Sequence, residues 1–144
     1  FESPSVGAGN QQYRPAGASC VFTGQSGVVA NGSGWTPTNA PAGTQIAMLQ
    51  STGTVASIAQ TLNFTASGNY TLSFGAAQRT SWGGAQALQI KVDGVNVGSV
   101  ITPSGASFAT YSVPFSVSAG NRTLSFNTVN NSGDNTCFID AVTL

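Results

Sequence analysis

The sequence predicts an all-β protein, an antiparallel β-sandwich of two sheets. Short runs in which apolar and polar residues alternate recur between clusters of Gly, Asn, Ser and Pro, a spacing typical of sandwiches and barrels. No segment shows the apolar period of a helix. The C-terminal run Asp134–Leu144 has no wholly polar face, which indicates a strand covered by apolar groups on both sides. We expect one domain over residues 1–144.

Each expected strand is an alternating run bounded by turn residues. Asp93-Gly94 marks the clearest hairpin, since both residues tolerate positive φ. The segments 68–74 and 120–126 repeat one pattern, with Leu and Phe two apart so that both face one core. In chain order the expected strands are Phe1–Val6, Ala18–Thr23, Gly27–Asn31, Thr44–Gln50, Ser57–Phe64, Asn69–Ala77, Ala87–Val92, Val95–Ile101, Ala109–Val117, Asn121–Val129 and Thr136–Leu144.

Composition excludes several classes of function. Charged residues make up 6% of the chain and the net charge is zero, whereas an ordinary soluble protein has about 25% charged residues. No basic patch can meet phosphates, which argues against nucleic-acid binding. No apolar run approaches the length of a membrane-spanning helix. A surface rich in hydroxyls and amides suits neutral ligands, and sugars are the leading class.

Catalytic groups are scarce. The chain has no histidine, which removes Ser-His-Asp and Cys-His nucleophiles and His-based zinc sites. The acids are Glu2, Asp93, Asp134 and Asp140. A glycosidase needs two carboxyls across a cleft, and Asp93 is already assigned to a turn. We therefore expect a protein that is not an enzyme.

Asp140 lies in the middle of the covered C-terminal strand. A carboxylate there is costly unless a cation or several donors meet it. With only four positive side chains in the sequence, a bound metal ion is one candidate partner, and backbone amides are the other.

The two cysteines, Cys20 and Cys137, each lie in a strand-like segment. Two buried thiols are one interpretation. The near absence of Lys and the polar surface favour an exported, extracellular protein, in which a disulfide between them persists. We expect this bridge, and the start at Phe1 leads us to expect a mature or excised module.

Aromatic residues occupy three of the predicted loops, at Tyr13, Trp35 and Trp82. Packing against the end of the sandwich explains a loop tryptophan in one way, and a platform for the apolar face of a sugar explains it in another. Arg79 ends a strand three residues before Trp82. Its guanidinium either donates to vicinal hydroxyls or neutralises Asp134.

Several segments together resemble the galactose-binding-like jelly roll, and more narrowly the non-catalytic carbohydrate-binding modules of bacterial polysaccharide-degrading enzymes. These segments are Phe1-Glu2-Ser3-Pro4, Gly17-Ala18-Ser19, Val21-Phe22-Thr23-Gly24, Tyr70-Thr71-Leu72-Ser73-Phe74 and Asp134-Asn135-Thr136-Cys137-Phe138-Ile139-Asp140. The resemblance implies a structural Ca²⁺ between the first and last strands. Glu2 and Asp140 would hold it, together with backbone carbonyls and the Asn31–Ser33 turn.

The resemblance also implies a sugar site on a sheet face or in loops at one edge. The candidate residues are Tyr13, Trp35, Gln50, Arg79, Trp82 and Asn135. We expect a monomeric module that binds a neutral β-linked polysaccharide of galactan, xylan or glucan type and is covalently linked to a glycan-active enzyme. A structural or adhesive extracellular sandwich that binds no sugar is the alternative. A small glycan lyase or hydrolase is the third hypothesis, with Asp134 as its best-placed loop acid.

Overall fold

The computed structural model describes residues 1–35 and 38–144. Residues 36 and 37, within the predicted Gly32–Gly43 connection, lie outside this description. The described residues form eleven strands and no helix. The strands are β1 (Gln11–Tyr13), β2 (Val21–Thr23), β3 (Gln25–Ala30), β4 (Gln45–Ser51), β5 (Ser57–Phe64), β6 (Gly68–Gln78), β7 (Leu88–Val92), β8 (Val95–Ile101), β9 (Ala109–Val117), β10 (Gly120–Thr128) and β11 (Asn135–Thr143).

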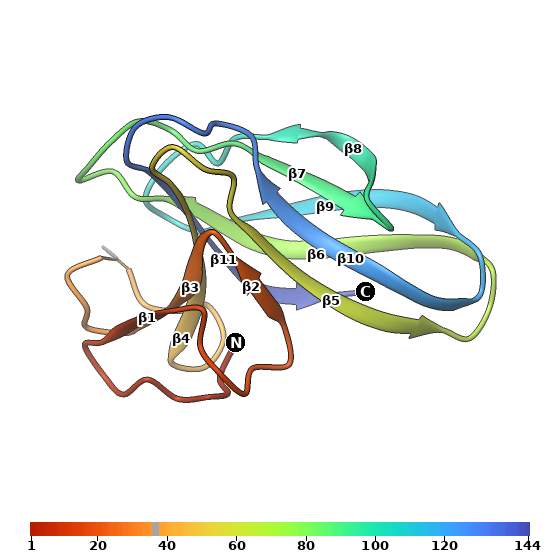
Figure 1. Cartoon of the computed structure of the whole chain (residues 1–144), viewed down its shortest axis with the longest axis horizontal. Helices are drawn as coiled ribbons and strands as arrows, with labels where there is room; N and C mark the ends of the chain where they lie inside the picture. The colour runs from red at the N-terminus through yellow and green to blue at the C-terminus, as the bar shows by residue number, and fades with distance from the viewer. Residues whose placement is uncertain (36–37) are drawn as a thin grey trace.

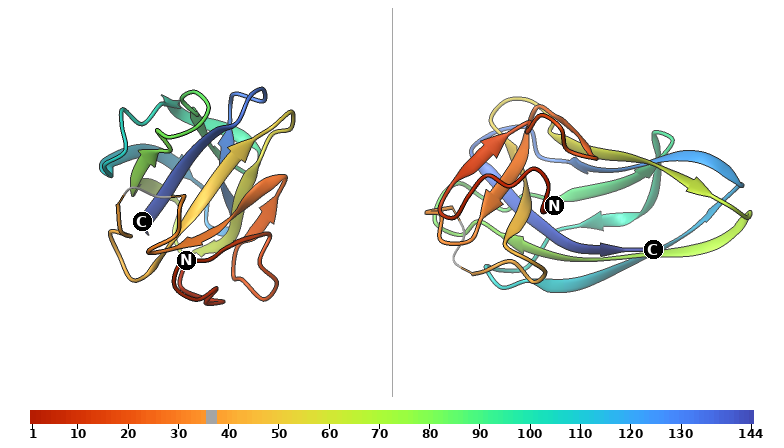
Figure 2. Two further views of the ribbon diagram at one scale, coloured as in Figure 1. Left: turned by 90° about the vertical axis from the view of Figure 1, so that its left-hand side faces the viewer. Right: turned by 90° about the horizontal axis from the view of Figure 1, so that it is seen from below.

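The strands build two antiparallel sheets, so the predicted sandwich is confirmed. One sheet has the order β1-β3-β4-β11-β6-β9 and the other the order β2-β5-β10-β7-β8. The two layers face each other along the length of the molecule (Figures 1 and 2). No helix in the described part of the chain is long and apolar enough to cross a membrane. β11 is a central strand, hydrogen-bonded to β4 on one side and β6 on the other.

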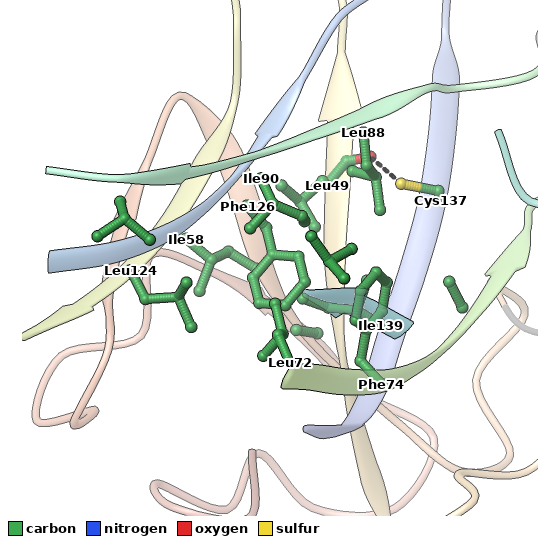
Figure 3. Close-up of a cluster of buried hydrophobic side chains, with 14 of the residues drawn as sticks. Leu49, Ile58, Leu72, Phe74, Leu88, Ile90, Leu124, Phe126, Cys137 and Ile139 are labelled. Atoms are coloured by element: carbon green, nitrogen blue, oxygen red, sulfur yellow. Dashed lines mark hydrogen bonds between the residues drawn. The ribbon is translucent and has the colours of Figure 1, made fainter. Parts of the chain in front are cut away.

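Large apolar side chains from both sheets fill the space between them. Leu72 and Phe74 of β6 meet Leu124 and Phe126 of β10 in this core (Figure 3). The Phe74 and Phe126 rings lie edge to face, with centroids 4.9 Å apart. The repeated Leu-x-Phe pattern therefore marks two equivalent strands, one in each sheet, as the alternation predicts.

A smaller apolar cluster covers the opposite, outer face of the six-stranded sheet. Val29, Ile46, Met48 and Phe138 form it, with Trp35, Ala40 and Phe108 packed against them. β11 thus sends Ile139 into the main core and Phe138 into the outer cluster. This double coverage is what the absence of a polar face in the sequence predicts.

The N-terminal segment differs from the prediction, because residues 1–10 form no strand. The buried side chain of Gln45 holds this segment instead. Gln45 Nε2 donates to the carbonyls of Phe1 at 2.8 Å and Pro4 at 3.1 Å, and Val6 N–H donates to Gln45 Oε1 at 2.6 Å. Pro4 has no N–H to contribute to a ladder. The edge of the sheet is formed by β1, which the sequence did not indicate, paired with β3.

The expected Cys20–Cys137 disulfide is corrected by the structure, in which both thiols are free. Cys20 precedes β2, an edge strand of the five-stranded sheet, whereas Cys137 lies in a central strand of the other sheet. Cys137 Sγ instead points to the carbonyl oxygen of Leu49, 3.9 Å away (Figure 3). Burial raises the pKa of the Cys137 thiol, so it behaves as a small core side chain.

Candidate functional site

The candidate site lies on the outer face of the six-stranded sheet, where β11 begins. Leu49 and Cys137 point into the core, so their neighbours Gln50 and Thr136 point outward. These two residues are directly opposite each other across β4 and β11. Arg79, the residue after β6, donates its backbone N–H to the Thr136 carbonyl at 3.0 Å. Three neighbouring strands therefore place Gln50, Thr136 and Arg79 in one row.

Asp134 is connected to this row through its carboxylate. Gln50 donates from Nε2 to Asp134 Oδ1, and Tyr13 donates from its hydroxyl to Gln50 Oε1. Arg79 Nη1 lies 3.6 Å from Asp134 Oδ2. Side chains from β1, β4, the residue after β6 and the loop before β11 thus form one network. Gln50 is buried, so it holds Asp134 in a defined orientation.

Trp35 forms a wall of this network. The Arg79 guanidinium carbon lies 4.1 Å from the centroid of the Trp35 ring, a cation–π contact. The Tyr13 and Trp35 rings meet edge to face, with centroids 6.1 Å apart. Because the guanidinium occupies one face of the Trp35 ring, this residue orients Arg79, and that ring face is not available to stack on a sugar.

Trp82 projects from the neighbouring loop and is 64% exposed. Gly83 fixes the position of this loop: its φ is +67°, and a Cβ there would overlap the carbonyl oxygen of Asp134. Gly84 N–H donates to Asn135 Oδ1, and Asn135 Nδ2 donates to the Ser132 carbonyl at 3.0 Å. The loops before β7 and β11 lie at the same end of the sandwich (Figure 1). Asn135 therefore braces the loop that carries Trp82 beside Asp134.

Two buried glutamines hydrogen-bond to the loops before β7 and β11. Gln78 and Gln86 exchange hydrogen bonds through Gln78 Nε2 at 2.7 Å and Gln78 Oε1 at 3.0 Å. Gln86 Nε2 also donates to Ser51 Oγ at 2.6 Å and to the Asn130 carbonyl at 3.1 Å. Sequence reasoning missed both residues, although amides within the apolar runs around them were a visible signal.

The network carries no net charge, because Arg79 and Asp134 compensate each other. Burial, together with the Asp134 charge, raises the pKa of Tyr13, and the Arg79 charge opposes this only in part. Tyr13 therefore stays protonated and keeps donating to Gln50. Aromatic surface, amides and a compensated ion pair are groups that bind neutral hydroxyl-bearing molecules by contact.

Glu2 and Asp140, the predicted metal ligands, lie at the N-terminal side of the molecule. Glu2 Oε2 accepts hydrogen bonds from the backbone N–H and the hydroxyl of Thr44 at 3.0 and 2.9 Å, and Oε1 accepts from Gln45 N–H at 3.1 Å. Asp140 Oδ2 accepts from Ala42 N–H at 2.9 Å. Among residues 1–35 and 38–144, no group of three or more His, Cys, Asp or Glu side chains could hold a metal.

The pKa values of the two carboxyls shift in opposite directions. Burial raises the pKa of Asp140, the charge of Glu2 adds to this, and the backbone amides of Ala42 and Ala141 offset only part of it. For Glu2, burial also acts to raise the pKa, but the hydrogen bonds from Thr44 and Gln45 outweigh it and hold the pKa low. Asp140 is thus a buried carboxylate with an acidic neighbour.

A cavity of about 460 Å³ opens between the sheets at this end of the molecule. Apolar side chains such as Phe22, Leu62 and Leu124 line most of it, with Glu2 and Asp140 near one side. None of the residues of the Arg79–Asp134 network lines it. Gln60 is the one amide side chain in this mainly apolar lining, whereas the network gathers amides, a guanidinium and a carboxylate, so we take the network as the candidate site.

Comparisons with known proteins place the chain in a family and a fold. The model of the family described as "Protein of unknown function (DUF642)" matches residues 22–144. No curated protein matches the chain. Among solved structures, TmCBM61 in complex with β-1,4-galactotriose aligns over 85% of each chain with 16% identity and a TM-score of 0.60.

Two further structures share the fold. The carbohydrate-binding module CBM36, in complex with calcium and xylotriose, aligns with 13% identity and a TM-score of 0.54 over 67% of this chain and 79% of that one. The EclA C-terminal domain, titled a sugar-binding protein, aligns with 18% identity and a TM-score of 0.53 over 59% of this chain. That alignment spans 63% of the EclA domain's own length, less than two thirds. These likenesses confirm the β-sandwich fold predicted from the sequence.

Proposed function

The chain belongs to the DUF642 family, and we propose that it is a non-catalytic module that binds a neutral β-linked polysaccharide of galactan, xylan or glucan type. The observation that carries this proposal is one connected network in which Gln50 and Arg79 contact Asp134, while Tyr13 contacts Gln50 and Trp35 contacts Arg79. Trp82 is exposed on the neighbouring loop. Structures of the same fold that are titled as complexes with galactotriose and xylotriose support a sugar as the ligand.

Within this proposal the residues have different roles. Trp82 offers a free aromatic face to the apolar side of a sugar ring, and Arg79 and Asp134 meet its hydroxyls. Trp35 and Asn135 position these groups. A few close contacts must offset the entropy cost of association, so we expect affinities of roughly micromolar to millimolar for short oligosaccharides.

Affinity electrophoresis against soluble galactan, xylan and glucan tests the proposal. At least one polymer should retard the protein, and Trp82→Ala should lose that retardation while keeping its melting temperature. Val95→Ala is the matched control, since Val95 is 68% exposed on the distant edge strand β8. If no polymer retards the parent protein, the sugar-binding proposal fails and a structural or adhesive sandwich is the function that remains.

We also propose that Glu2 and Asp140 bind one structural Ca²⁺. The two carboxyls line one cavity wall and their charges interact, so a cation between them would relieve the repulsion that helps raise the pKa of Asp140. Ca²⁺ takes about six to eight oxygen ligands. Backbone carbonyls would have to supply most of them, because Thr44 and Gln45 already engage Glu2. Bound calcium would supply stability only.

Calcium titration followed by thermal unfolding tests this second proposal. Calcium added to chelator-treated protein should raise the melting temperature of the parent, because a ligand bound only by the native state stabilises it. Asp140→Asn should abolish the increase. If millimolar calcium leaves the melting curve of the metal-free parent unchanged, the calcium proposal is wrong.

We also propose that the module is monomeric, extracellular and attached to a glycan-active enzyme that it keeps near its substrate. The scarcity of charge supports export, and the absence of histidine leaves catalysis poorly supplied. Light scattering of the purified domain, and the sequence of the full-length gene product, test these points.

A further inference from the structure

We propose that Arg79 and Asp134 act together as a selective clamp for a sugar hydroxyl, and that Asp134 excludes acidic sugars from the site. This inference rests on the proposed function and goes further, because it assigns a binding role to Asp134 and defines the accepted sugars by charge.

The Arg79 guanidinium has unused hydrogen-bonding capacity. Its side chain is only 10% exposed, and Nε is buried without a hydrogen-bond partner among the described residues. The Nη1–Oδ2 separation of 3.6 Å to Asp134 exceeds the roughly 3.2 Å limit of a normal N–H···O bond. A guanidinium buried without acceptors is costly, so the arrangement calls for acceptor atoms from a ligand.

Asp134 has complementary unused capacity. Gln50 occupies Oδ1, while Oδ2 accepts no hydrogen bond from the described residues and the side chain is 42% exposed. Because Tyr13 fixes Gln50, and Gln50 fixes the carboxylate, Oδ2 is held in place beside Arg79. The gap between Arg79 and Oδ2 therefore offers a donor on one side and an acceptor on the other.

The hydroxyl is the group that satisfies both sides at once, because it donates one hydrogen bond and accepts others. A uronate carboxylate only accepts, and it would meet the like charge of Asp134. An ammonium only donates, and it would meet Arg79. The pair is neutral as a whole, so the selection acts only at contact distance, where repulsion between like charges is strongest. Solvent at this partly exposed site screens part of that repulsion.

Thr136 of β11 lies beside Arg79. Its residue is fully buried, and its Oγ1 is the second buried side-chain atom in the described residues without a partner. Thr136 and Arg79 are joined by a backbone hydrogen bond on adjacent strands, and both side chains point to the outer face. The two buried atoms without a partner thus belong to two residues joined through their backbones, and a polar ligand beside them would explain both.

The test compares neutral and acidic polymers with the same ring on the parent protein and two variants. The pairs are galactan with polygalacturonate and xylan with glucuronoxylan, and glucan with partially oxidised glucan is the third. Asp134→Asn keeps the shape of the side chain and removes its charge. Asp93→Asn is the matched control, because Asp93 is equally exposed at 42% and paired with Arg122 at 3.1 Å on the far β7–β8 turn.

The parent should bind the neutral member of a pair more tightly than the acidic member. Asp134→Asn should lose roughly tenfold or more in affinity for the neutral polymer, the size of a charge-assisted hydrogen bond, and should reduce or reverse the preference over the acidic polymer. Asp93→Asn should match the parent in both respects.

Three results would overturn the clamp. They are equal binding of both members of a pair by the parent, an unchanged neutral affinity in Asp134→Asn, or an equal effect of Asp93→Asn. The first of these requires no variant, so the proposal stays testable if Asp134→Asn fails to fold. If the parent binds no polymer at all, the proposed sugar-binding function is wrong. This outcome differs from the three results that contradict only the clamp.

Discussion

Asp134 lies just before β11 and Asp140 lies in the middle of this strand, and the two carboxylates have different hydrogen-bond partners. Among the described residues, Asp134 Oδ2 accepts no hydrogen bond, and it lies beside Arg79, whose buried Nε has no partner either. In the middle, Asp140 and its neighbour Glu2 receive backbone amides from residues 42–45. The Asp134 carboxylate thus keeps hydrogen-bonding capacity, whereas Glu2 and Asp140 use most of theirs on backbone amides. The hydrogen bonds of Glu2 and Asp140 also join the N-terminal segment, residues 42–45 and β11 to one another.

Gly83→Ala should have the largest effect, and it should act on the surroundings of Asp134. The new Cβ would overlap the Asp134 carbonyl, which is backbone, and the φ of +67° strains any L-residue. The loop must shift, so we expect a loss of more than roughly tenfold in polysaccharide affinity with a stability cost of about 1 kcal/mol. Affinity electrophoresis and denaturant unfolding measure the two effects. Gly94→Ala shares the positive φ but meets no atom within 4 Å, so it should keep its affinity; equal losses in both variants would contradict the argument.

Gly43→Ala should act on the surroundings of Glu2 and Asp140, and it should lower stability without changing sugar affinity. Its Cβ would overlap the Glu2 carboxylate, and φ is +72°. Glu2 would move and give up its bonds to Thr44 and Gln45, which should cost about 1–2 kcal/mol of unfolding free energy. Sugar affinity should not change. A Gly43→Ala variant that keeps its stability would contradict the predicted role of the Glu2 hydrogen bonds. A variant that loses sugar affinity would show that the surroundings of Asp134 and Asp140 are not independent.

The pH dependence of stability distinguishes the two aspartates further. The native pKa of Asp140 is raised by burial, while an unfolded aspartate titrates near about 3.9. Between these values the native state binds more protons than the unfolded state, so the unfolding free energy falls as pH rises. In chelator, the parent should therefore lose stability relative to Asp140→Asn as pH rises above about 4. Denaturant unfolding at several pH values checks this, and parallel curves would refute it.

Thr136→Val should give the smallest effect and the clearest contrast. Thr136 Oγ1 is buried without a hydrogen-bond partner in the part of the chain that the structure describes. Replacing this hydroxyl with a methyl group should therefore leave the unfolding free energy unchanged or raise it by no more than about 1 kcal/mol. Thr128→Val is the control, since Thr128 Oγ1 accepts from Ala56 N–H at 2.8 Å and its loss should destabilise the protein. Equal destabilisation by both changes would mean that Thr136 has a hidden partner.

The sequence predicted most of the fold because alternation is a local signal. The Asp93-Gly94 hairpin has both residues at positive φ, 49° and 80°, as expected. Short-range patterns failed where long-range contacts decide. Gln45 holds residues 1–6 through its side chain, so a run that alternates like a strand forms none. The Cys20–Cys137 bridge was wrong because spacing along the chain says nothing about which strand lies at a sheet edge.

For the candidate site, residue type was informative and role was not. Tyr13, Trp35, Gln50 and Arg79 were selected as groups that suit sugars, and the fold gathers them. That Trp35 lies against Arg79, and that Asn135 braces a loop, depends on side-chain orientation that no sequence period encodes. Thr136 was missed because a threonine in a strand is ordinary until its neighbours are known. Whether these residues bind sugar remains a prediction.

The position of β11 has a kinetic consequence. The strand nearest the C-terminus of the described chain lies between β4 and β6, so the six-stranded sheet stays divided until residues 135–143 insert. Such non-local pairing slows folding, because the entropy cost of closing the loop comes before the stabilising contacts form. Insertion of β11 would then complete the surroundings of Asp134 and Asp140 together, and a folding intermediate that lacks this strand would display neither. Recovery of sugar binding should follow the slowest refolding phase.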